Sequence, residues 1–115
     1  MAKVLIMLVR VLSLVSIVLG ALVWTEHKEY LGSHIGSGFL LVILVFALAV
    51  IALTKKIVVS GILGVVFAVL LPLVGLEQLP PTFRTFGALQ IAHVVLALAT
   101  ISVAESLYVA IRKAG

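Results

Sequence analysis

Hydrophobic residues dominate four long segments of the chain, and few polar residues interrupt them. The segments cover residues 4–24, 35–54, 57–74 and 88–111. An α-helix needs about 20 mostly apolar residues to cross the hydrocarbon core of a bilayer, so the pattern predicts four membrane-spanning helices. The connections between the segments are too short to hold a separate domain. We therefore expect residues 1–115 to form a single four-helix transmembrane domain.

The composition supports membrane insertion. Of the 115 residues, 64% are hydrophobic and only 10% are charged, and the mean hydropathy is +1.43. A soluble domain carries about a quarter charged residues, so the apolar excess is too large for one small core and must face lipid. The chain has no cysteine, which excludes disulfides, thiolate metal sites and CxxC redox motifs.

The basic residues predict how the chain is oriented. Lysine and arginine accumulate on the cytoplasmic side of membrane proteins. Six of the eight fall on the side that holds both chain ends, namely Lys3, Arg10, Lys55, Lys56, Arg112 and Lys113. We expect a multi-pass protein of the cell membrane, in contact with lipid, with both termini in the cytoplasm. The net charge of +4 then reflects topology and does not indicate nucleic-acid binding.

The second and fourth segments have the same layout. Each has a histidine near its outer end, His34 or His93, and each closes with a basic pair, 21 or 19 residues further on. At 1.5 Å per helical residue, the two histidines lie at nearly equal depth. We expect an all-α, integral membrane, up-down four-helix bundle. Its two hairpins would be related by a pseudo-two-fold axis along the membrane normal, as in other membrane proteins built from parallel repeats.

The two histidines are the main candidates for function, because an ionisable group in hydrocarbon is costly. In an up-down bundle the second and fourth helices lie diagonally across the core, where two imidazoles suit axial ligation of a haem iron. Gly38 and Ala97 lie one helical turn after the histidines, and their small size leaves room for a flat macrocycle. We expect His34 and His93 to ligate the iron, with Gly38 and Ala97 beside the ring.

Charged residues at the outer end complete this hypothesis. Lys28 and Arg84 are placed to pair with haem propionates. Two alternatives remain for the histidines. They can form hydrogen bonds across the bundle, or they can bind zinc together with loop residues such as Glu26 and Glu29, since zinc needs more than two ligands.

Two charges interrupt the apolar segments, Arg10 in the first and Glu105 in the fourth. Both lie at a similar depth in the cytoplasmic half, on helices that are neighbours in a closed bundle. We expect a structural ion pair between them, with a proton or quinone site as the alternative. The serines and threonines within the segments, such as Ser13, Thr100 and Ser102, are expected to form hydrogen bonds between helices.

Four short stretches carry a family resemblance. They are Gly20-Ala21-Leu22-Val23, Ser33-His34, Ile62-Leu63-Gly64-Val65-Val66 and Ala88-Leu89-Gln90-Ile91-Ala92-His93. Together they resemble one half of haem A synthase, the membrane enzyme that oxidises a methyl group of haem O to a formyl group. That family has two four-helix halves, each with a histidine pair on its second and fourth helices. The resemblance implies that His34 and His93 are the axial ligands, with haem b as cofactor or haem O as substrate.

The sequence differs from the family at named positions. Leu31 stands three residues before the first histidine, where the family usually has a glutamate. In the family this glutamate is thought to take part in the chemistry. The resemblance therefore makes the nearest acid, Glu29, the candidate catalytic residue. Ile35 replaces the arginine that often follows the histidine, and the paired cysteines of the outer loop are missing. A single half would also have to form a homo-oligomer to hold both cofactor and substrate.

Three other functions remain open from the sequence. The first is a b-type cytochrome subunit that transfers electrons in a respiratory complex. The second is a cofactor-free accessory subunit of such a complex. The third is a small multidrug exporter, although that family relies on a glutamate in the first helix, where this chain has Arg10.

Overall fold

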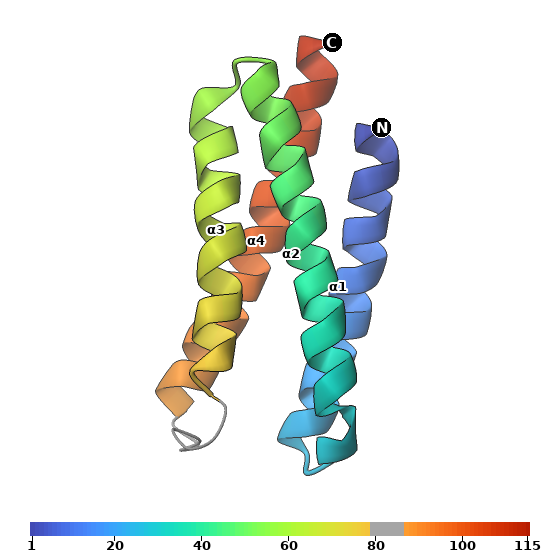
Figure 1. Cartoon of the computed structure of the whole chain (residues 1–115), viewed down its shortest axis with the longest axis vertical. Coiled ribbons are helices and arrows are strands. Elements are labelled where there is room, and N and C mark those ends of the chain that lie inside the picture. Colours follow the sequence, from blue (N-terminus) through green and yellow to red (C-terminus); the bar gives the residue numbers. More distant parts are fainter. Residues whose placement is uncertain (79–86) are drawn as a thin grey trace.

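The computed structural model describes residues 1–78 and 87–115, and these residues form four long α-helices (Figure 1). The helices are α1 (Ala2–Trp24), α2 (Leu31–Thr54), α3 (Val58–Leu76) and α4 (Gly87–Ala114), and a short 3₁₀ helix, η1 (Lys28–Tyr30), precedes α2. All four long helices have the length and apolar character needed to span a membrane. The prediction of an all-α, four-helix chain is confirmed. Helices α1, α2 and α4 begin one to four residues before the predicted segments, and α3 and α4 end two or three residues after them. Helix α3 begins one residue later than predicted, and α1 and α2 end where predicted. The differences arise because helical hydrogen bonding does not stop where the apolar residues do.

The helices alternate in direction and pack as a ring. Helix α1 contacts α2, α2 contacts α3, α3 contacts α4, and α4 returns to α1; α2 and α4 also touch across the diagonal. Both termini and the α2–α3 connection lie at the same end of the bundle, at the top of Figure 1. We call this the basic end, because Lys55 and Lys56 form the connection and Arg112 and Lys113 lie near the C-terminus. The other end, where His34 and His93 lie, is the histidine end.

The tightest packing lies in the middle of the bundle and toward the basic end. Val45, Leu48 and Ala49 of α2 are completely buried, as is Leu107 of α4. Gly64 of α3 allows this close approach, because a Cβ atom there would lie 2.9 Å from the Ala49 Cβ and 2.8 Å from the Leu107 Cδ1. Large apolar side chains such as valine, leucine and isoleucine cover the outside of all four helices, which is typical of a lipid-facing surface.

A tight turn joins α2 to α3. Lys56 adopts a positive φ of 63°. Two backbone hydrogen bonds close the turn: the Lys56 N–H donates to the Leu53 carbonyl (3.0 Å), and the Ile57 N–H donates to the Ala52 carbonyl (2.9 Å). This pattern is a Schellman motif, which satisfies the last carbonyls of a helix. It brings the chain back after three residues, 55–57, and so fixes α3 beside α2.

The prediction of interhelical hydrogen bonds by serine and threonine is wrong for three side chains. Ser13, Thr100 and Ser102 each donate to the carbonyl four residues earlier in their own helix. That carbonyl is the nearest acceptor for a short hydroxyl side chain in a helix.

Candidate functional site

His34 and His93 face each other inside the bundle near its histidine end. Their ring centroids are 6.2 Å apart and their planes are inclined by 81°. His34 lies in the first turn of α2 and His93 in the second turn of α4, and both are half-buried. The structure thus brings together, across the diagonal of the bundle, the two histidines to which the sequence assigned equal depth.

Each histidine ring lies directly over a glycine of the preceding helix. A Cβ atom on Gly20 of α1 would lie 2.9 Å from the Cε1 of His34, and a Cβ atom on Gly75 of α3 would lie 2.9 Å from the Cε1 of His93. Real Cβ atoms essentially never approach another atom so closely, so only glycine leaves this space. The sequence alone assigns neither glycine to the site. The sequence signal for these positions is that each glycine stands inside an apolar helical segment. A glycine in such a segment usually has a packing or functional reason.

The hydrogen bonds of the two rings differ. The Nδ1 of His34 lies 2.8 Å from the Ser16 carbonyl oxygen and 3.4 Å from the Ser16 hydroxyl. Since a carbonyl oxygen only accepts, the proton resides on Nδ1 and Nε2 keeps a free lone pair. The Nδ1 of His93 is buried and has no hydrogen-bond partner within the described part of the chain, although the Leu71 backbone carbonyl lies near the ring. Metal-binding histidines usually donate their second ring N–H to such a carbonyl.

A cavity of about 460 Å³ contains the two histidines, and all four helices line it. Each residue of α3 that lines the cavity lies 55 positions after a lining residue of α1. Each residue of α4 that lines the cavity lies 59 positions after a lining residue of α2. Representative pairs are Ile17 and Pro72, Gly20 and Gly75, His34 and His93, Gly38 and Ala97, and Phe39 and Leu98. The two hairpins therefore present equivalent positions to the cavity.

The other residues expected at the site divide into three groups. Gly38, Ala97 and Lys28 line the cavity, with Lys28 at its mouth. Glu29 is exposed and is not among the described residues that line the cavity, whereas Glu26 is. Arg84 lies outside the described residues.

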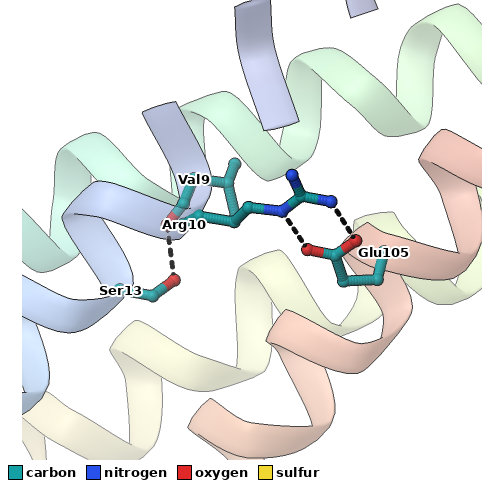
Figure 2. A network of polar contacts seen from close by, with 4 residues as sticks. All are labelled: Val9, Arg10, Ser13 and Glu105. Atoms are coloured by element: carbon teal, nitrogen blue, oxygen red, sulfur yellow. Dashed lines mark hydrogen bonds and ion pairs between the residues drawn. The ribbon is translucent and has the colours of Figure 1, made fainter. Parts of the chain in front are cut away.

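Arg10 and Glu105 pair on the opposite, basic half of the bundle (Figure 2). The Arg10 Nε lies 2.7 Å from Glu105 Oε1, and its terminal nitrogen NH2 lies 2.9 Å from Oε2. The side chains are 52% and 37% exposed, and neither lines the cavity. This two-bond pair joins α1 to α4 and is separate from the histidine site.

Comparison with known proteins leaves the site to be interpreted from its own chemistry. No family model matches the chain, and no curated protein or solved structure matches it. Within residues 1–78 and 87–115, no group of three or more histidine, cysteine, aspartate or glutamate side chains could hold a metal ion. The described part of the chain thus offers no ligand set for zinc. The geometry brings two imidazole rings together inside the bundle.

Proposed function

We propose that this protein binds one haem between His34 and His93, within the membrane. The observation that carries the proposal is the 6.2 Å separation of the ring centroids. A metal–imidazole bond is about 2.0 Å long, and a ring nitrogen lies roughly 1.1 Å from the centre of the ring. Two imidazoles on opposite sides of one metal ion therefore have centroids about 6 Å apart, which is close to the separation here.

The other features of the site fit haem. The Ser16 carbonyl holds the His34 proton on Nδ1, which leaves Nε2 for the iron. Gly20 and Gly75 make space for the two rings. The cavity of about 460 Å³ falls within the range of 300–1,000 Å³ typical of ligand pockets. When bound, the haem supplies one-electron chemistry, and this chain's residues hold the group and exclude water.

We also propose the orientation of the bundle in the membrane. The basic end would face the cytoplasm, because six of the eight basic residues lie on that side. The constant numbering of equivalent lining residues supports two hairpins related by a pseudo-two-fold axis along the membrane normal. With the basic end in the cytoplasm, the two histidines would lie below the outer surface of the membrane.

Electron transfer is the function that this site supports best. His34 and His93 would together hold the iron and leave no position at the metal for a substrate, which would suit electron transfer more than substrate chemistry at the iron. The protein would then be a b-type cytochrome, alone or as a subunit of a respiratory complex. Glu29, the acid that the resemblance to haem A synthase offers as catalytic, is exposed and is not among the described residues that line the cavity.

Oxidation of haem O is the second candidate, and one observation favours it. Glu26 lines the cavity mouth, so an acid is present near the place where the substrate would lie. In this case a homo-oligomer would have to provide separate sites for cofactor and substrate. Conversion of supplied haem O by the purified protein, lost in Glu26→Gln, would favour the enzyme over the electron carrier.

Absorption spectra of the purified, haem-loaded protein test the main proposal. We expect a six-coordinate, low-spin haem spectrum that collapses in both His34→Ala and His93→Ala. The matched control is His27→Ala, because His27 is exposed in the connection after α1 and should leave the spectrum unchanged. A native spectrum in both ligand variants, or no haem retained by the native protein, would refute the proposed site.

A further inference from the structure

The cavity reaches the side of the bundle between α1 and α4. Two of its lining residues on this side, Ile17 of α1 and Leu98 of α4, are 47% and 54% exposed. They also lie at the same level. Arg10 and Glu105 pair across these antiparallel helices, and Ile17 and Leu98 each lie seven residues beyond that pair toward the histidine end. Seven residues correspond to about 10 Å along a helix.

The ion pair and the packing define the limits of this opening. Toward the basic end, Arg10 and Glu105 close the gap between α1 and α4. Toward the histidine end, Trp24 of α1 continues the exposed lining. The exposed lining residues at the opening are apolar, so the cavity opens onto the hydrocarbon core if the bundle lies in a bilayer.

The equivalent side between α2 and α3 is less exposed, although Leu76 of α3, which also lines the cavity, is 43% exposed. Pro72 and Phe39 are the counterparts of Ile17 and Leu98 there; Pro72 is half-buried and Phe39 is 41% exposed. A three-residue turn holds α2 to α3 at the basic end. No such turn joins α1 to α4, which are the first and last helices of the chain.

We propose that haem enters and leaves the cavity sideways from the lipid, through the opening between α1 and α4 that Ile17 and Leu98 flank. This inference rests on the proposed haem function and names the route and the physical state of the ligand. A macrocycle dissolved in the bilayer would move between two apolar environments, so its apolar faces would avoid transfer through water. The alternative route passes the charged mouth at Glu26 and Lys28 and requires haem to arrive from water.

A reversible cross-link across the opening tests the route. The chain has no cysteine, so Ile17→Cys/Leu98→Cys introduces the only two thiols. A short, cleavable bis-maleimide would link them in the haem-free protein in liposomes. Haem b is then added in the lipid phase, and its uptake is followed by quenching of Trp24, the sole tryptophan, which lines the cavity. We expect the link to slow uptake by about tenfold or more, as for a closed gate, and cleavage to restore it.

A second cross-link provides the matched control. Phe46→Cys/Phe67→Cys joins α2 to α3 three residues beyond the contact between Ala49 and Gly64. Neither residue lines the cavity, so this link should leave the rate of uptake unchanged. Unchanged uptake with the α1–α4 link closed, slowing by the control link, or failure of the reagent to join Ile17→Cys and Leu98→Cys would each overturn the lateral route.

The spectrum separates this failure from failure of the proposed function. Cross-linked protein that takes up haem at the native rate and shows the six-coordinate spectrum refutes only the route. Native protein that acquires no six-coordinate haem refutes the haem site, and the route with it.

Discussion

At the scale of single residues, the space around the histidines is set by glycines on neighbouring helices. From the sequence, Gly38 and Ala97, which follow the histidines on the same helices, are the residues expected to make room. Both do line the cavity, but Gly20 and Gly75 are the positions where a side chain would collide with a histidine ring. Which residues face each other depends on the rotation of each helix about its axis, and sequence spacing does not fix that rotation between helices.

We expect Gly75→Ala to weaken haem binding by about tenfold or more, which corresponds to about 1.4 kcal/mol. The added methyl group would lie 2.9 Å from the His93 Cε1, so the ring would have to move. Gly36→Ala is the matched control, because no described atom lies within 4 Å of a Cβ at this position and Gly36 does not line the cavity. Haem titrations followed by absorbance would measure both affinities. Equal affinities in the two variants would show that the glycine contact does not position His93.

At the scale of helices, the Arg10–Glu105 pair is the polar link between α1 and α4. Its two hydrogen bonds match the forked geometry in which arginine binds a carboxylate most strongly. The equal depth of the two residues was visible in the sequence. The two-bond geometry was not, since it requires the two helices to be neighbours with the correct rotation.

Exchange of the two charges tests this link. We expect Arg10→Glu and Glu105→Arg, each alone, to lower the thermal midpoint in detergent micelles, because each single variant places like charges together. The double variant restores an opposite pair and should recover most of the loss. Lys113→Glu, at the exposed C-terminal end, is a control for the change in net charge. A double variant as unstable as the sum of the two singles would indicate that the pair does not hold α1 to α4.

At the scale of the whole molecule, the two hairpins diverge from the tightly packed part of the bundle toward the histidine end (Figure 1). Buried residues fill the middle of the bundle, and the cavity lies beyond them. One arrangement thus combines a packed part that holds the helices together with an open part that can accept a ligand.

The proposed orientation predicts which end of the bundle is accessible from outside the cell. A single cysteine in Glu29→Cys should react with a membrane-impermeant thiol reagent in intact cells, because η1 lies at the histidine end. A cysteine in Gly115→Cys, at the C-terminus beside Lys55, should react only after the membrane is opened. The native chain, which has no thiol, gives the background. The reverse labelling pattern would contradict a cytoplasmic basic end.

The sequence by itself determined that the chain forms four long apolar helices, because helix length and hydropathy depend only on neighbouring residues along the chain. It also placed the two histidines at a common level, since rise per residue is constant in a helix. Only the tertiary structure decided that the rings face each other over Gly20 and Gly75 and that a cavity opens between α1 and α4. These features depend on the tilt and rotation of each helix, which packing against its neighbours sets.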